Sequence, residues 1–244
     1  MLIQKYKDAR AGNGEFVVLE GVHSIKHALR FGADIVDIAV VDLKRVKDIM
    51  ESVGAVKEAR ELAKRARALP KSEFEKLAKI PPHTGAIALS KKPREKQKLK
   101  DKIVFLENPN SLHNLGAVIR VLASRGIKNI FVSGEQNPWH SECIRTSAGL
   151  HFAMESVRQI SLNNLLKFAK GSDRKIFAFD ADGEDVFATE IPDNVILAFG
   201  TERSGLSKKI KENSEKIVSI PMQEGVSSLN LATAVAIGVY ADIK

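Results

Sequence analysis

Three stretches of this sequence combine glycines with polar residues that could bind and orient a ligand. They are NSLHNLGAVIR (110–120), FGTERSGLS (199–207) and IPMQEGVSSLNLA (220–232). Their polar side chains include Asn114, Arg120, Glu202, Ser228 and Asn230. Guanidinium, carboxylate, hydroxyl and amide groups supply hydrogen-bond donors and acceptors to a polar ligand. The pattern indicates one binding site assembled from three distant segments.

Each stretch also has a purely structural interpretation. Asn114 is placed to cap the helix that carries Arg120, and Ser207 is placed to cap a helix after the second stretch. Either Ser227 or Ser228 could cap the last helix, which would put Asn230 in its first turn. No G-x-G-x-x-G or Walker loop occurs, which counts against a nucleotide-phosphate site.

The elements around these stretches alternate between strand and helix from residue 102 onward. The apolar runs KIVFL, NIFVS, KIFAF, NVILAF and KIVSI read as buried strands, separated by helical patterns such as NLGAVIRVLASRG and SLNNLLKFAKGSD. This alternation predicts an α/β fold with a mostly parallel sheet covered on both faces. Ligands bind beyond the carboxyl ends of such strands, and all three polar stretches follow a strand.

The first part of the chain reads as a separate small α/β domain. A strand–helix–strand pattern spans 15–41, a long charged helical pattern spans 43–67, and a closing strand spans 84–90. A basic, proline-containing linker separates the domains, so we expect domains at 1–89 and 102–244 with a linker at 90–101.

The net charge of +8 is placed unevenly along the 244 residues. Residues 1–100 hold 22 Lys and Arg against 13 Asp and Glu, a net +9, whereas residues 101–244 hold 16 against 17, a net −1. The excess favours a polyanion-binding module at the N-terminal end, although a merely solvated surface is an equal alternative on charge alone.

Composition also narrows the class of protein. No apolar run reaches the roughly 18 residues of a membrane span, and the start MLIQKYKDAR has no apolar signal core. We therefore expect a cytoplasmic protein without membrane association. The single cysteine, Cys143, excludes an internal disulfide and a cysteine-rich metal site, and we expect no metal ion.

Taken together, the patterns N-L-G-x-x-x-R, F-G-x-E-x-x-G-L-S and I-P-M-x-x-G-V-x-S-L-N resemble the SpoU/TrmH branch of the SPOUT methyltransferases, which methylate RNA ribose 2′-hydroxyls. The resemblance covers about 102–244, and RTSAGLHFAMES (145–156) is similar to a segment between the family's first two motifs. The N-terminal part resembles, more weakly, a ribosomal-protein-like substrate-binding domain. Arg203 and the approach NSLHN depart from the usual family pattern.

This resemblance implies a deep trefoil knot that binds S-adenosylmethionine. By the same resemblance, the cofactor site is lined by Gly200, Ile220, Met222 and Leu229. It also implies a homodimer formed through the C-terminal domain, in which each active site takes residues from both chains. The final helix, made thin by Ala232, Ala234, Ala236 and Gly238, suits such an interface.

The implied reaction moves a methyl group to a ribose 2′-hydroxyl of RNA, with ribosomal RNA favoured over transfer RNA. Arg120 would clamp a substrate phosphate and stabilise the developing alkoxide, and Asn114 would fix its geometry or that of the ribose. The remaining site residues would hold the loops and the hydroxyl: Glu202, Ser228 and Asn230. Two alternatives stay open, a catalytically silent RNA-binding protein and a methyltransferase acting on an RNA base.

Overall fold

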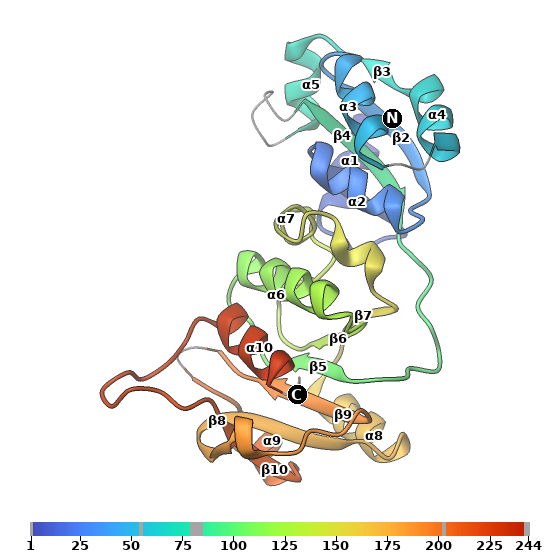
Figure 1. Ribbon diagram of the computed structural model, residues 1–244. Coiled ribbons are helices and arrows are strands. Elements are labelled where there is room, and N and C mark those ends of the chain that lie inside the picture. The colour runs from blue at the N-terminus through green and yellow to red at the C-terminus, as the bar shows by residue number, and fades with distance from the viewer. Residues whose placement is uncertain (1, 54–55, 79–84, 202–203, 242–244) are drawn as a thin grey trace. The chain divides into compact units, whose positions relative to one another are not determined.

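The computed structural model describes residues 2–53, 56–78, 85–201 and 204–241 and divides into two compact units (Figure 1). The first unit comprises Met1–Arg94 and Asn137–Ala153, and the second comprises Glu95–Gln136 and Met154–Lys244. No helix in the described ranges is long and apolar enough to cross a membrane.

The first unit packs helices against a four-stranded sheet. Its elements are α1 (Leu2–Arg10), β1 (Phe16–Glu20), α2 (Val22–Arg30), β2 (Ile35–Val40), α3 (Lys44–Val53), α4 (Val56–Arg65), β3 (Arg67–Ala68), α5 (Lys71–Leu77), β4 (Ala86–Lys91), α7 (Ser141–Thr146) and the 3₁₀ turn η2 (Leu150–Ala153). The strand order is β1-β4-β2-β3, with β4 antiparallel to both neighbours. Tyr6 and Phe74, both fully buried, pack from the helices onto this sheet.

The predicted strand–helix–strand pattern and closing strand of this unit are confirmed as β1, α2, β2 and β4. The charged helical pattern predicted over 43–67 is confirmed as α3 and α4, except that Arg67 lies in β3. Residues 54 and 55 lie outside the described ranges.

Residues 137–153 belong to the first unit, although the predicted boundary assigns them to the C-terminal domain. Asn137 Nδ2 donates to Ala11 O and to Asn13 Oδ1, both at 2.8 Å. At Gly12, whose φ is +72°, an added Cβ would lie 2.3 Å from the carbonyl oxygen of Trp139. Hydrogen bonding and close backbone packing thus attach residues 137–153 to α1 and the loop after it. This segment, called the excursion below, leaves the second unit after residue 136 and returns to it at residue 154.

His151 sits at the centre of this excursion, completely buried. Its ring nitrogens lie 2.8 Å from Ser147 Oγ and 2.7 Å from Pro138 O. Desolvation lowers the pKa of His151 from 6.5 to about 4, so the ring is neutral in the folded protein at neutral pH.

We therefore expect acid to destabilise the protein through His151. The unfolded chain takes up this proton near pH 6.5 and the folded chain only near pH 4, so stability is full above 6.5 and falls as pH drops toward 4. The loss of stability attributable to this group is about 3 kcal/mol, at about 1.4 kcal/mol per pH unit.

Chemical denaturation at several pH values measures this loss, and His151→Gln should flatten this part of the stability profile. His23→Gln, at an exposed histidine of the same unit, is the control. Equal slopes for His151→Gln and wild type would contradict the assignment.

The second half of the predicted linker is fastened to the second unit. Arg174 donates to Asp101 O at 2.6 Å and to Leu99 O at 2.9 Å. Arg158 Nε lies 2.8 Å from Glu95 Oε2. Residues 95–101 are therefore attached to the second unit by hydrogen bonds and an ion pair, although most of their side chains are exposed.

The second unit is built on a six-stranded sheet. Its elements are β5 (Ile103–Leu106), α6 (Leu112–Arg125), β6 (Asn129–Val132), β7 (Ser156–Gln159), α8 (Leu162–Gly171), β8 (Lys175–Asp185), η3 (Val186–Ala188), β9 (Val195–Phe199), α9 (Lys208–Glu212), β10 (Lys216–Ser219) and α10 (Leu231–Tyr240). The order is β10-β8-β9-β5-β6-β7, and each neighbouring pair is parallel. The predicted α/β class and parallel sheet are confirmed, and the trefoil knot stays a prediction.

Helices cover both faces of this sheet (Figure 1). Ala178 and Ala198 pack with Leu165 of α8 and Ile210 of α9 in one core cluster. Their neighbours Phe179 and Phe199 point to the opposite face, because side chains alternate along a strand. There α10 approaches so closely that a Cβ on Gly238 would lie 2.7 Å from the Phe179 ring.

Candidate active site

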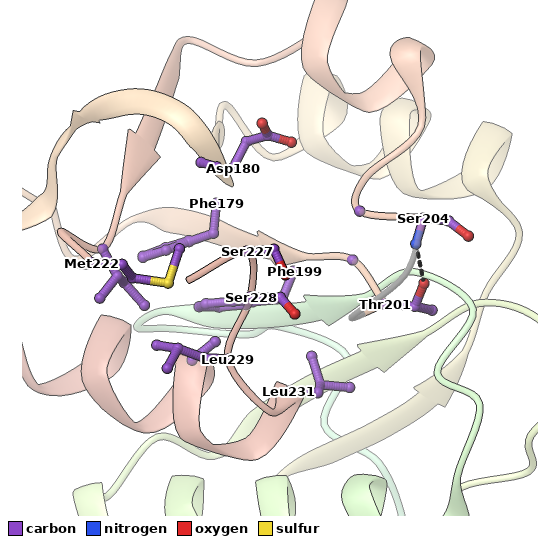
Figure 2. A pocket seen from close by; sticks show the side chains of 15 residues that line it. Phe179, Asp180, Phe199, Thr201, Ser204, Met222, Ser227, Ser228, Leu229 and Leu231 are labelled. Carbon is purple, nitrogen blue, oxygen red and sulfur yellow. Dashed lines mark hydrogen bonds between the residues drawn. The ribbon is translucent and has the colours of Figure 1, made fainter. Parts of the chain in front are cut away.

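A pocket of about 310 Å³ lies at the carboxyl ends of β9 and β10 and beside the middle of β8, where the pairing of β8 with β9 ends (Figure 2). Its lining comprises Phe179, Asp180, Ala181, Phe199, Gly200, Thr201, Ser204, Gly205, Ile220, Met222, Ser227, Ser228, Leu229, Leu231 and Ala234. All four residues predicted to line a cofactor site are among them, together with Ser228. In Figure 2, Met222 and Leu229 border the pocket on one side and Thr201 and Ser204 on the other.

Two stacked phenylalanines form an apolar wall of the pocket. The rings of Phe179 and Phe199 lie 4.2 Å apart between centroids and 17° from parallel. Phe199 ends β9, Phe179 is its partner on β8, and α10 packs against both through Gly238. The wall is therefore fixed by the sheet and by a helix, which favours a preformed site for a ligand with an apolar, flat part.

The loop after β9 is folded tightly on itself. Gly205 N donates to Thr201 O at 2.9 Å, and Ser204 N donates to Thr201 Oγ1 at 3.2 Å, the dashed line of Figure 2. A Cβ on Gly200 would lie 2.1 Å from the carbonyl carbon of Gly205, so only glycine allows this fold. The predicted residues Glu202 and Arg203 lie outside the described ranges.

A buried carboxylate anchors the far end of this loop. Glu107, at the carboxyl end of β5, accepts a 2.7 Å hydrogen bond from Ser207 N. Ser207 also caps α9, since its hydroxyl accepts from Ile210 N at 3.4 Å, as the structural interpretation of the sequence predicts. The loop is thereby tied to the strand that leads into the first polar stretch.

Asn114 and Asn230 come together although 116 positions separate them. Asn230 Nδ2 donates to Asn114 Oδ1 at 3.1 Å, and Asn230 Oδ1 accepts from Ala232 N at 3.0 Å. Because the Ala232 amide occupies the oxygen of Asn230, the amide group of Asn230 is oriented with its nitrogen toward Asn114. Two of the predicted site residues thus form one hydrogen-bonded pair.

The predicted helix caps are wrong in both of these places. Ser111, rather than Asn114, is the N-cap of α6, and its hydroxyl accepts from the amides of His113 and Asn114. Asn230, rather than Ser227 or Ser228, is the N-cap of α10. Capping moves to the residue whose side chain reaches the first free amides, which leaves Asn114 available for its contact with Asn230.

Arg120 does not line this pocket. It is exposed on α6, six residues after Asn114. At 3.6 residues per turn the two side chains leave the helix about 120° apart, so they do not converge on one point within a single chain.

The family of the chain follows from a comparison with protein-family models. The model of the SpoU rRNA Methylase family matches residues 101–240. The chain belongs to this SpoU family. The predicted membership is confirmed, and the match lies within the second unit with its excursion. The SpoU domain therefore carries the pocket and the Asn114–Asn230 pair.

Named relatives of this SpoU protein include tRNA/rRNA methyltransferases. An uncharacterized tRNA/rRNA methyltransferase of Mycobacterium sp. (strain KMS) is 32% identical over 144 residues, covering 58% of this chain and 45% of the relative. The chain thus spans less than half the length of such curated relatives. A putative TrmH family tRNA/rRNA methyltransferase of Staphylococcus haemolyticus (strain JCSC1435) is 25% identical over 242 residues, covering 93% of this chain and 94% of the relative.

Solved structures share the fold over nearly the whole chain. The SpoU methyltransferase AviRb from Streptomyces viridochromogenes in complex with the cofactor AdoMet has a TM-score of 0.80 at 23% identity, covering 99% of this chain and 96% of AviRb. An RNA 2′-O ribose methyltransferase has a TM-score of 0.74 at 22% identity, covering 98% and 90% of the two chains.

Sequence reasoning missed several lining residues of the SpoU pocket. Phe179, Asp180 and Ala181 come from the middle of β8, which the three polar stretches do not include. The available signal was the acidic residue directly after the apolar run KIFAF. Thr201 and Ser204 lie inside the second stretch, but the residues predicted from that stretch for the site are Gly200 and Glu202.

Proposed function

We propose that this protein transfers a methyl group from S-adenosylmethionine to a ribose 2′-hydroxyl of RNA, with ribosomal RNA favoured over transfer RNA. The observation that carries the proposal is the pocket at which the second and third polar stretches meet. It lies at the carboxyl ends of parallel strands, where α/β folds bind ligands. Membership of the SpoU family supports the reaction class.

The pocket suits this cofactor in size and chemistry. Its volume of about 310 Å³ falls at the lower end of ligand sites, which span roughly 300–1,000 Å³. Phe179, Phe199 and Met222 offer apolar contact to a flat heterocycle, and Gly200 allows the backbone to come close. When bound, S-adenosylmethionine supplies a methyl group that is already activated by its sulfonium.

The residues of this chain then have to align the acceptor and accommodate its lost proton. Holding reactants in line lowers a barrier by about 7–11 kcal/mol. In the proposal, Asn114, oriented by Asn230, and Ser228 at the pocket position the ribose. Arg120 clamps a substrate phosphate through its planar fork and stabilises the developing alkoxide. A phosphate oxygen or water takes the proton, because a guanidinium does not lose its own. Glu202, by its family position, holds the second loop.

A homodimer through the second unit completes the proposal. Arg120 leaves α6 on a different side from Asn114 and does not line its own chain's pocket. A second copy related by two-fold symmetry can bring its arginine to the pocket of the first. Small residues along α10, such as Ala232 and Ala236, allow two helices to approach closely.

The first unit is proposed to bind the RNA. Its residues 1–94 hold 19 Lys and Arg against 12 Asp and Glu, a net +7, and lysine and arginine side chains neutralise phosphates without reading sequence. The reaction would take place in the cytoplasm.

Methylation assays with two RNA pools test the proposal. Purified protein is incubated with radiolabelled S-adenosylmethionine and, separately, ribosomal and transfer RNA from a strain that lacks this gene. We expect labelled 2′-O-methyl nucleosides from ribosomal RNA after digestion. A labelled base would show that the methyl acceptor is an RNA base and not the ribose. No label together with no cofactor binding would favour a catalytically silent RNA-binding protein.

Substitutions of Asn230 separate its two contacts. Asn230→Asp retains the capping oxygen but cannot donate to Asn114, which must then reverse its amide. We expect its melting temperature to stay near that of wild type while turnover falls about 10- to 100-fold, because the acceptor is misaligned. Asn230→Ala should lose the same activity and also about 1 kcal/mol of stability. Thermal unfolding and methyl transfer measure both. Full turnover by Asn230→Asp would refute the positioning role.

A further inference from the structure

Asp180 is the one carboxylate among the described residues that line the pocket (Figure 2). It follows the last buried residue of β8 before the strand runs into exposed positions. Only 13% of its side chain is exposed. The other lining residues are apolar, hydroxyl-bearing or glycine. Placing a carboxylate against such a wall costs desolvation free energy, and ligand pockets are typically apolar with a few placed polar groups.

A lysine of α9 holds one oxygen of this carboxylate. Lys211 Nζ lies 2.5 Å from Asp180 Oδ2, and 34% of the lysine side chain is exposed. The other oxygen, Oδ1, has a long contact of 3.5 Å with the amide of Asp182. A carboxylate accepts about four hydrogen bonds, so Asp180 retains acceptor capacity after both contacts. Lys211 fixes the carboxylate and offsets its charge.

We infer that Asp180 is a cofactor-specificity residue that accepts hydrogen bonds from the ribose hydroxyls of S-adenosylmethionine; this inference rests on the proposed function. The cofactor has three kinds of good donor: its ribose hydroxyls, its ammonium group and its adenine amino group, and the 2′-deoxy probe used below separates the first from the third. An ammonium placed on this carboxylate would lie beside the Lys211 cation and be repelled by it. A neutral hydroxyl is not repelled by Lys211, and its hydrogen bond to an ionised acceptor is stronger than one between two neutral groups.

The test measures dissociation constants by calorimetry with the full-length protein. The probes are S-adenosylmethionine, 5′-methylthioadenosine, which keeps the ribose but has no amino-acid part, and 2′-deoxy-5′-methylthioadenosine. We expect Asp180→Ala to weaken binding of the first two probes about equally, by about 10- to 100-fold. Removing the 2′-hydroxyl should weaken binding to wild type by a similar factor and to Asp180→Ala by less than about threefold.

Two further variants guard against a loss of structure. Lys211→Ala removes the ion pair but leaves the carboxylate, so it should keep the penalty for the missing 2′-hydroxyl. Glu184→Gln, in the same strand, removes an ion pair with Lys216 at 3.3 Å outside the pocket and should bind every probe as wild type does. Melting temperatures of all variants show whether they fold.

Specific outcomes overturn the inference. Unchanged affinities in Asp180→Ala would remove Asp180 from recognition. Weaker binding of S-adenosylmethionine alone, with 5′-methylthioadenosine unaffected, would assign the carboxylate to the ammonium group. If Lys211→Ala binds 5′-methylthioadenosine and its 2′-deoxy form equally well, recognition of the 2′-hydroxyl requires the Asp180–Lys211 ion pair and not the carboxylate alone. If wild type binds neither S-adenosylmethionine nor 5′-methylthioadenosine, the proposed cofactor itself is wrong and the inference falls with it.

Discussion

Replacing Arg120 by alanine should lower kcat for methyl transfer by about 10²- to 10³-fold while leaving the dissociation constant of S-adenosylmethionine unchanged. The size follows from loss of one preorganised donor to a developing oxyanion. The unchanged cofactor affinity follows from the geometry, because Arg120 is exposed on α6 and is absent from the lining of its own chain's pocket. Single-turnover methylation and calorimetry measure the two quantities.

Arg120→Lys distinguishes a planar clamp from a simple positive charge. Lysine keeps the charge but cannot reproduce the two parallel hydrogen bonds of a guanidinium. We expect it to recover only a small part of the turnover lost in Arg120→Ala. Full turnover by Arg120→Lys would rule out a bidentate clamp.

Mixed dimers show whether the arginine acts on the pocket of the other chain. Coexpression of Arg120→Ala chains with Gly200→Ala chains yields about half heterodimers if assembly is random. Should each site combine one chain's pocket with the other chain's arginine, every heterodimer has one intact site, and activity returns to about a quarter of wild type. The assay holds the cofactor near its wild-type dissociation constant, where both parent variants are weakly active. If pocket and arginine act within one chain, every site carries a defect and the mixture shows no gain over the two variants measured separately.

The sequence predicts the sheet and the place of the site because both depend on local patterns. Apolar runs such as those of β5 and β9 can only be buried strands in this arrangement, and a glycine-rich stretch directly after such a strand lies at the ligand-binding edge. Gly200, Ile220, Met222 and Leu229 therefore meet at one pocket, although the first and the last are 29 positions apart.

Contacts that depend on strand order and tertiary packing could not be predicted. Asp180 reaches the pocket because β8 lies beside β9, and the sequence does not state that order. The excursion 137–153 belongs to the first unit through the hydrogen bonds of Asn137 and the close packing of Gly12 against Trp139. No hydrophobic periodicity in the sequence predicts these contacts. Ser111 and Asn114 are equally good cap residues by type, and only the contact with Asn230 decides between them.

The second large effect is expected from a single methyl group on Gly200. Its Cβ would lie 2.1 Å from the carbonyl carbon of Gly205, 2.2 Å from its oxygen and 2.4 Å from the nitrogen of Leu206. All three are backbone atoms, so no side chain can rotate away. The loop has to open, and its Thr201–Gly205 hydrogen bond of 2.9 Å closes the same turn. Gly200→Ala therefore reshapes the pocket from within.

Overpacking of this kind costs about 1–3 kcal/mol, and we expect most of it to appear as lost cofactor binding because the loop is at the pocket. The affinity for S-adenosylmethionine should fall about 10- to 100-fold, at about 1.4 kcal/mol per factor of ten. Gly171→Ala is the matched control, since nothing lies within 4 Å of the Cβ it would add at the end of α8. It should bind as wild type does and be equally or slightly more stable. Wild-type affinity in Gly200→Ala would mean that the loop after β9 does not form the cofactor site, because no cofactor held there could tolerate the movement that this methyl group requires.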